Sequence, residues 1–287
     1  PGMRWTPALW QMRRLRRLRR PHARFAGSVP GRASVAYAVL GCSLGLRASA
    51  SWSAPIVVTG HNYRGSIPDG LRYRKDFISH TEERELVSIL DGGEWLRHLK
   101  SRAQQFFGLV YYQTTHEVPS LQPAESTFQE GRPMDDLPGW LLPRVLNTGT
   151  FPRQGEVNQV AANEYLETAG IAGHVEEPTA FGPNLATLSL LKPVQLVMVP
   201  AAFHETVRRK ETNGVDHGNW IKILLEPRSL LVLQGESRYG YSHGIRRSKL
   251  VQLENGEMLK RGSDYRRVSL TFRELLETRR QLSVTPS

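Results

Sequence analysis

Hydrophobic and polar residues alternate strictly near the C-terminus, in the sequence RRVSLTFRE of residues 266–274. Because side chains of an extended strand point alternately to its two faces, one face of this segment is polar and the other is apolar. The polar face carries Arg267, Ser269, Thr271 and Arg273, and the apolar face carries Val268, Leu270 and Phe272. An amphipathic strand with its polar face in water is one interpretation. A strand whose polar face lines a binding site is the other.

A helical pattern precedes this region at residues 79–93. Ser79 is followed three positions later by Glu82, which is the spacing of a capping box, and an apolar stripe at residues 86–90 ends at Gly92 and Gly93. This pattern predicts a helix. A second, shorter helix is predicted at residues 140–147, and the four prolines between residues 117 and 139 predict mostly loop.

From residue 157 onward the pattern changes to short β-type runs that are separated by turns. A strand or hairpin is also expected within residues 101–115. The seven runs after residue 157 are 159–165, 186–191, 195–199, 220–225, 229–233, 240–245 and 268–272. Because no helices intervene, they predict an antiparallel sandwich or barrel with helices packed outside it. The fold class is therefore α+β, mainly β, with a jelly-roll (double-stranded β-helix) core and flanking N-terminal helices.

The net charge of +11 belongs to the N-terminal part of the chain. The first 68 residues contain eleven of the 38 basic residues and no acidic residue, which leaves 27 of each sign from Asp69 onward. A domain that binds a phosphate backbone mainly by electrostatics would normally show its own basic excess. The neutral body therefore argues against strong nonspecific DNA binding.

The basic segment resembles a mitochondrial transit peptide, because it is rich in Arg and free of acids. We therefore expect a leader or partner-binding arm at 1–66, a folded domain at 67–280 and a tail at 281–287. A secretory signal with Ala33–Leu46 as its apolar part is a rival interpretation, and a disordered basic arm is another. Fourteen apolar residues are too few for a membrane span, which needs about 20, so we expect none.

Candidate metal ligands come from histidine and carboxylate, because Cys42 is the only cysteine and excludes a thiolate cage. His174 and Glu176 are two residues apart and would share one face of an extended segment. His243 ends a later predicted strand and supplies a third group. Two imidazoles and one carboxylate are typical of non-haem Fe(II) oxygenases, although zinc accepts the same set. An isolated His-x-Glu is more often a surface feature.

Such an iron site works with a dicarboxylate cosubstrate, whose distal carboxylate requires a permanently charged donor. Arg267 follows His243 in the chain and is placed to be that donor, with Arg273 on the same face of the strand. Asn163 and Tyr165 are likewise two residues apart and could add hydrogen bonds to the same ligand.

Three ordered segments resemble the AlkB family of Fe(II)/2-oxoglutarate-dependent dioxygenases, in particular its eukaryotic branch. They are NEYLETAGIAGHVEEPTAFGPNLATLSL, EPRSLLVLQGESRYGYSHGI and RRVSLTFR, and the resemblance extends from about residue 67 to residue 272. It implies that His174, Glu176 and His243 bind Fe(II). It also implies that 2-oxoglutarate is held by Asn163, Tyr165, Arg267 and Arg273.

The resemblance also places a substrate lid in the aromatic segment after residue 104, with Gln105, Phe107, Tyr111 and Tyr112 as its residues. Packing over the barrel mouth is the alternative for this segment. The family implies dioxygen as a second cosubstrate and oxidation of a methylated nucleic-acid base, RNA rather than DNA, or of a protein side chain. Glu176 stands where the family usually has Asp. A non-catalytic subunit of a large mitochondrial assembly, bound through residues 1–60, is therefore the second hypothesis.

Overall fold

A computed structural model of the chain describes residues 51–58, 65–110, 129–153, 155–203 and 220–276. The chain divides into two compact units, residues 1–48 and 49–287, and all described residues belong to the second. Residues 1–50 of the predicted leader, the tail and the predicted lid residues Tyr111 and Tyr112 lie outside the described residues. Residues 51–58 of that leader are described and belong to the second unit, where Ile56–Val57 forms a strand.

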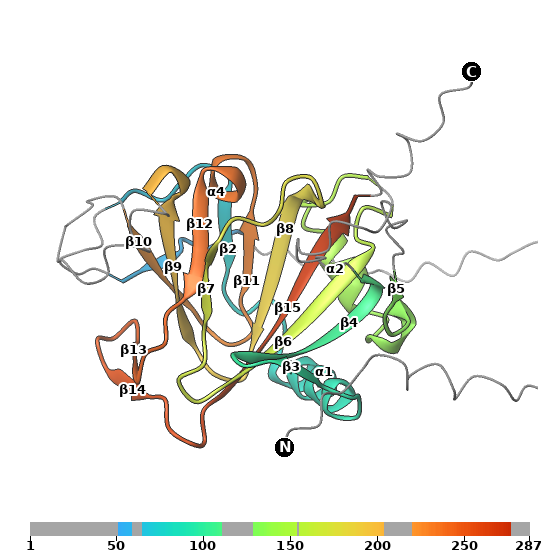
Figure 1. The fold of residues 1–287 in the computed structure, drawn as a ribbon, viewed down its shortest axis with the longest axis horizontal. Helices are drawn as coiled ribbons and strands as arrows, with labels where there is room; N and C mark the ends of the chain where they lie inside the picture. The colour runs from blue at the N-terminus through green and yellow to red at the C-terminus, as the bar shows by residue number, and fades with distance from the viewer. Residues whose placement is uncertain (1–50, 59–64, 111–128, 154, 204–219, 277–287) are drawn as a thin grey trace, which may run out of the picture. The chain divides into compact units, whose positions relative to one another are not determined.

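Two antiparallel sheets face each other in the second unit (Figure 1). The major sheet contains, in spatial order, β2 (Leu71–Arg74), β11 (Leu230–Leu233), β8 (Phe181–Leu190), β15 (Arg266–Leu275), β6 (Gln159–Leu166), β4 (Arg102–Val110) and β3 (Leu96–Leu99), with β5 (Gln129–Glu130) paired to β4. The minor sheet contains β1 (Ile56–Val57), β10 (Ile221–Leu225), β9 (Val194–Pro200), β12 (Tyr241–Ile245) and β7 (Ile171–His174). The predicted jelly-roll fold class is confirmed.

Few helices accompany the sheets in the described part of the chain. They are α1 (His80–Asp91), the 3₁₀ turn η3 (Met134–Asp136), α2 (Leu141–Leu146) and α4 (Gly235–Tyr239), and a separate hairpin is formed by β13 (Leu250–Gln252) and β14 (Met258–Lys260). The predicted capping box starts α1: the Glu82 amide donates to Ser79 Oγ, and the Ser79 amide donates to Glu82 Oε2. None of these helices is both long enough and apolar enough to cross a membrane.

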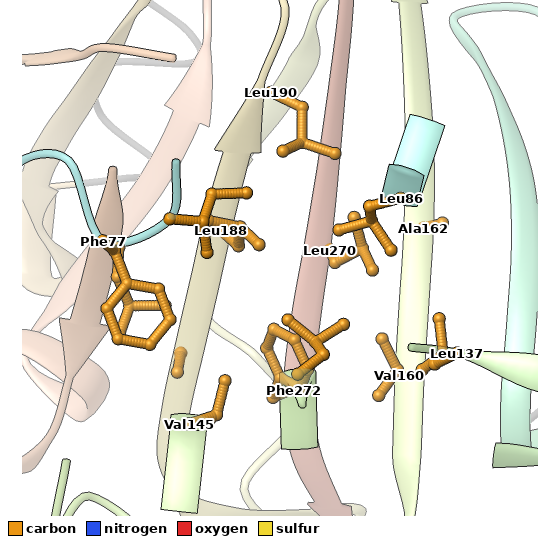
Figure 2. Packing of buried hydrophobic residues seen from close by; sticks show 14 of the residues in the cluster. Phe77, Leu86, Leu137, Val145, Val160, Ala162, Leu188, Leu190, Leu270 and Phe272 are labelled. Atoms are coloured by element: carbon orange, nitrogen blue, oxygen red, sulfur yellow. The ribbon is translucent and has the colours of Figure 1, made fainter. Parts of the chain in front are cut away.

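The outer face of the major sheet is apolar and is covered by α1 and α2. Leu86 and Leu90 of α1 and Val145 of α2 pack against Leu270 and Phe272 of β15, and all five are fully buried (Figure 2). Burying a large apolar side chain stabilises the fold by about 1.5–3 kcal/mol. The apolar face of the alternating segment therefore anchors the helices, and its polar face must point toward the minor sheet.

Between the two sheets the space is only partly filled by apolar side chains. Tyr73, Leu196, Met198, Ile223 and Leu231 belong to the second core cluster, which packs there. The remaining space is a cavity of about 690 Å³. The polar face of β15 lines it through Arg267, Ser269, Thr271 and Arg273, so this face does not lie in bulk water.

Candidate metal and cosubstrate site

The three candidate metal ligands meet on the minor-sheet side of the cavity. His243 of β12 lies directly opposite His174 of β7 in the strand register, and their rings are 4.7 Å apart between centroids. Glu176 follows β7 by two residues. One ligand atom from each of the three residues lies within 4.8 Å of the other two.

The two imidazoles can both present a lone pair. His174 Nδ1 lies 2.9 Å from the Ala172 carbonyl, which holds the proton on Nδ1 and leaves Nε2 as the free acceptor. Burial of the His243 ring, helped by the neighbouring His174, lowers the pKa of His243 to about 3, so this imidazole is neutral at physiological pH. A neutral ring is the form that binds a metal ion.

Glu176 is held from two sides by arginines, of which Arg238 is buried and Arg273 is partly buried. Arg273 Nη1 donates to Glu176 Oε1 over 2.9 Å, and the guanidinium of Arg238 donates to the main-chain carbonyl of Glu176 over 2.7 Å. Burial alone would raise the pKa of Glu176, but Arg273, the two histidines and Arg238 outweigh it and lower that pKa. Glu176 is therefore an anion at neutral pH, with its carboxylate turned toward the two histidines despite its longer side chain.

Arg267 lies toward the other end of the same polar face. It is 2% exposed, and its Nη2 donates to Ser189 Oγ over 3.0 Å. Its Nε and Nη1 are buried and have no hydrogen-bond partner among the described residues. Because buried polar groups are normally paired, two unpaired nitrogens on a buried cation mark a place for an anionic ligand.

Asn163 is fixed in position by two residues of β4. Arg102 Nε and Gln104 Nε2 both donate to Asn163 Oδ1, over 3.1 and 2.9 Å. With its oxygen engaged, the amide presents Nδ2 as a donor. Tyr165 lies below the Arg267 guanidinium, which is 5.4 Å from the ring centroid.

Comparison with known proteins shows the family to which the chain belongs. Residues 70–273 match the model of the 2OG-Fe(II) oxygenase superfamily, and these residues include every group described above. The chain belongs to this superfamily. Its curated relatives place it in the AlkB homologue branch.

Three of these relatives are distant. An alkylated DNA repair protein ALKBH8 homolog of Arabidopsis thaliana is 26% identical over 72% of this chain and 58% of its own length. The tRNA (carboxymethyluridine(34)-5-O)-methyltransferase ALKBH8 of Mus musculus is 26% identical over 69% of this chain and 27% of its own length. The mitochondrial alpha-ketoglutarate-dependent dioxygenase alkB homolog 7 of Bos taurus is 30% identical over 48% of this chain and 54% of its own length. The chain thus spans less than two thirds of each relative.

The residues of this AlkB homologue fit the iron and 2-oxoglutarate that the superfamily implies. Two imidazoles and a carboxylate converge on one point, which suits Fe(II). The unpaired nitrogens of Arg267 suit a carboxylate in the same cavity. His174, Glu176 and His243 would hold the metal, and Arg267, Asn163 and Tyr165 would hold the keto acid.

Arg273 has a different position from the one predicted. It lines the cavity of the AlkB homologue, but its Nε donates to Gln159 Oε1 over 2.6 Å and its Nη1 donates to Glu176. In the structure its hydrogen bonds are therefore with Gln159 and with the candidate metal ligand Glu176. Its predicted contact with 2-oxoglutarate stays a prediction.

The predicted lid residues Gln105 and Phe107 lie on the wrong face of β4. Phe107 is fully buried in the core under the helices, and Gln105 donates to the Leu90 carbonyl on the same side. Gln104 and Phe106 line the cavity instead. In a strand a shift of one residue exchanges the two faces, and the register of β4 against β6 was not accessible from the sequence.

The prediction also missed Arg102, Gln104 and Arg238. Arg238 lies within the segment GESRYGYSHGI, and a charged residue inside an otherwise β-rich motif was the available signal. Arg102 and Gln104 alternate with the buried Ala103, which is a period-2 signal. Neither signal predicts that Arg238 contacts Glu176 or that Arg102 and Gln104 contact Asn163.

Proposed function

We propose that this AlkB-type oxygenase is an active Fe(II)/2-oxoglutarate-dependent dioxygenase that oxidises an N-methylated nucleic-acid base, in RNA rather than DNA, or else a protein side chain. The observation that carries the proposal is the buried Arg267 with two unpaired nitrogens in the cavity that also contains the histidine–glutamate–histidine group. Burying such a cation costs free energy unless a ligand accepts hydrogen bonds from its unpaired nitrogens.

Each residue has a stated role in this proposal. His174, Glu176 and His243 bind iron, and Arg267 pairs with the distal carboxylate of 2-oxoglutarate. Asn163 donates from Nδ2 to the same ligand, because Arg102 and Gln104 occupy its oxygen. Tyr165 packs beneath Arg267 and keeps the guanidinium in place.

The bound metal and cosubstrate would supply dioxygen activation, coupled to decarboxylation of 2-oxoglutarate to succinate, with one oxygen atom entering the substrate. The protein positions these groups. Arg273 and Arg238 hold the side chain and main chain of Glu176, so that its carboxylate stays in line with the two imidazoles. The surrounding apolar walls, such as Leu185 and Leu231, exclude water from the site.

Two observations support a nucleic-acid base, in RNA, as the substrate, and a further one argues against tight nonspecific DNA binding. The described domain lies in a body with equal numbers of acidic and basic residues, which disfavours tight nonspecific DNA binding. The mouse relative is named as a tRNA methyltransferase. Phe106 lines the cavity and is partly exposed, so its ring could stack on an unpaired base.

The test is succinate release from a panel of methylated single-stranded RNA, DNA and peptides. We expect succinate to rise above the uncoupled background with methylated RNA and not with its unmethylated counterpart. If only peptides stimulate succinate release, the substrate is a protein side chain instead. No stimulation by any member, with iron and 2-oxoglutarate bound, would favour the non-catalytic alternative.

One observation favours that alternative, a non-catalytic subunit of a mitochondrial assembly. Glu176 replaces the usual Asp, and a longer ligand moves the carboxylate by about one C–C bond, about 1.5 Å. The convergence of the three ligand atoms weighs against it. Metal binding without turnover on any substrate would support it.

We also propose a mitochondrial location, with residues 1–48 as leader or arm, 49–280 as the oxygenase domain and 281–287 as a tail. The boundary predicted at residue 66 is moved because β1 (Ile56–Val57) pairs with β10 of the minor sheet. The acid-free basic segment and the mitochondrial name of the bovine relative support this location. Fluorescent fusions with and without residues 1–48 test it. Secretion of the full-length fusion would contradict it.

A further inference from the structure

A second, basic groove of about 340 Å³ opens beside the catalytic cavity. It lies between the turn that joins β3 to β4 and the segment that joins β6 to β7, and Arg247 after β12 completes it. Its basic side chains are Arg97, Lys100, Arg102 and Arg247. None of these is among the residues to which the proposed chemistry assigns direct contact with iron or 2-oxoglutarate.

The charge of this groove is positive and only partly neutralised. Its two acidic residues are Glu164, which is buried and pairs with Arg97 over 3.0 Å, and the exposed Glu167. Within the described residues, Lys100 and Arg247 are exposed and no ion pair is formed by either. Clefts lined by one sign of charge concentrate counter-ions and raise their association rate.

The groove and the catalytic cavity share two residues, Ser101 and Arg102. Arg102 stands at the junction, and its Nε is hydrogen-bonded to Asn163 in the cavity. The junction therefore lies beside Asn163, one of the residues that we propose bind 2-oxoglutarate.

The junction also lies at the Arg267 end of the polar face of β15. In the strand register, Arg267 of β15 lies opposite Tyr165 of β6. The preceding residue of β6, Glu164, lies opposite Ala103 of β4, and both Glu164 and Ala103 line the groove. Arg273, which contacts Glu176, is six residues farther along β15, a distance of about 20 Å along the strand. A small dianion that enters from this groove therefore reaches Arg102 and Arg267 first.

We propose that this groove is the entry site for the dicarboxylate cosubstrate, and that Lys100 and Arg247 attract 2-oxoglutarate before Arg102 admits it to Arg267. The proposal rests on the proposed function, because it requires that 2-oxoglutarate binds in the cavity. Lys100 and Arg247 touch the arriving anion but not the bound one. They therefore set the association rate and leave the dissociation rate unchanged.

The test is a stopped-flow measurement of 2-oxoglutarate binding to the full chain loaded with Fe(II), followed anaerobically by visible absorption. The variant is K100E/R247E, and the control is Arg84→Glu, an exposed residue of α1, which covers the outer face of the major sheet. At about 10 mM ionic strength we expect the association rate constant of K100E/R247E to fall at least about fivefold below that of the control. At about 1 M salt, where the Debye length is about 3 Å, the difference should disappear.

Equal association rates in K100E/R247E and Arg84→Glu at low salt would overturn the inference. An unchanged rate accompanied by weaker binding of single-stranded RNA would overturn it too, and would assign the groove to the substrate. A difference that persists at about 1 M salt would also count against electrostatic attraction. If the unmodified chain with Fe(II) binds no 2-oxoglutarate at all, the proposed function itself fails, which is a distinct result.

Discussion

Arg267 is the residue whose surroundings say most about the chemistry of this protein. It is buried at 2% exposure, its only recorded hydrogen-bond partner among the described residues is Ser189, and burial lowers the pKa of its guanidinium. The next residue, Arg266, is fully paired by Glu164 and Asp91 on the opposite face of the strand. Of these two adjacent arginines, Arg266 is paired within the fold, and Arg267 is the one that we propose binds a ligand.

Replacing Arg267 by Met should abolish most of the affinity for 2-oxoglutarate. Removing one partner of a buried charge pair costs about 2–5 kcal/mol, which corresponds to a loss of roughly 30-fold or more. Calorimetric titration of the Mn(II)-loaded protein measures the affinity. Arg266→Met is the matched control and should lower the free energy of unfolding without changing 2-oxoglutarate affinity. Equal affinities in Arg267→Met and the unmodified chain would refute the role of Arg267.

At the residue scale the sequence predicted which side chains gather but not what each one contacts. Spacing by two residues was sufficient for His174 and Glu176, and for Asn163 and Tyr165, because strand alternation places such pairs on one face. It was insufficient for Arg273, since the contact with Glu176 depends on how two sheets approach each other. It was also insufficient for Gln105 and Phe107, because one residue of register exchanges the faces of β4.

At the scale of elements, the close approach of β7 and β12 determines whether the two histidines meet. Gly244 follows His243, and a Cβ at this position would lie 2.7 Å from the amide nitrogen of Gly173 and 2.9 Å from the carbonyl oxygen of Ile171. Real Cβ atoms do not approach backbone atoms so closely. The absence of a side chain at Gly244 therefore permits the strand pairing that brings His174 and His243 together.

Gly244→Ala should separate β7 from β12 and weaken metal binding at least tenfold, because ligand atoms tolerate displacements of only about 0.2 Å. Competition with a chromogenic chelator for Mn(II) measures the affinity. Gly139→Ala is the control, since a Cβ there meets no atom within 4 Å. Metal affinities that are the same in the two variants would contradict this account of the strand pairing.

Helix α1 offers a prediction about pH. Glu82 accepts hydrogen bonds from both Nη atoms of Arg144 and also from the Ser79 amide, and these contacts, Arg144 first, lower the pKa of Glu82 to about 2. Its ordinary value is 4.5, so the unfolded chain binds this proton more readily. The resulting stability is complete above pH 4.5 and is lost as the pH falls toward 2.

Urea unfolding at pH 5 and at pH 3 measures this effect. We expect the unmodified chain to lose about 1–2 kcal/mol more than Glu82→Gln does between these two pH values, after allowance for solvent screening of a partly exposed pair. A parallel loss of stability in the two proteins would show that Glu82 is not the group responsible.

The elements themselves were largely predictable. The seven runs after residue 157 correspond to β6, β8, β9, β10, β11, β12 and β15, because short alternating or β-branched runs between turns are local signals. The strand β7 was not predicted, since its sequence IAGH contains Ala and Gly and few strand formers. Pairing with β12 makes it a strand, and pairing partners are not encoded locally.

At the scale of the whole molecule, the two faces of the major sheet have different roles. The outer face of the major sheet is apolar and binds the helices, and the inner face is polar and lines the cavity. A basic groove adjoins this cavity at Ser101 and Arg102, and the three candidate metal ligands line the same cavity. The jelly roll thus provides a partly enclosed polar interior in a protein whose described domain is otherwise held together by apolar packing.

The central claim is that two imidazoles, one carboxylate and a buried guanidinium form a single site for Fe(II) and 2-oxoglutarate. Anaerobic titration of the protein with Fe(II), then with 2-oxoglutarate, tests it most directly through the weak visible charge-transfer absorption of such complexes. The account predicts an absorption band that appears only when both are present, saturates at one equivalent of iron and is absent in His243→Ala. No band at saturating concentrations of both, with a folded protein, would contradict it.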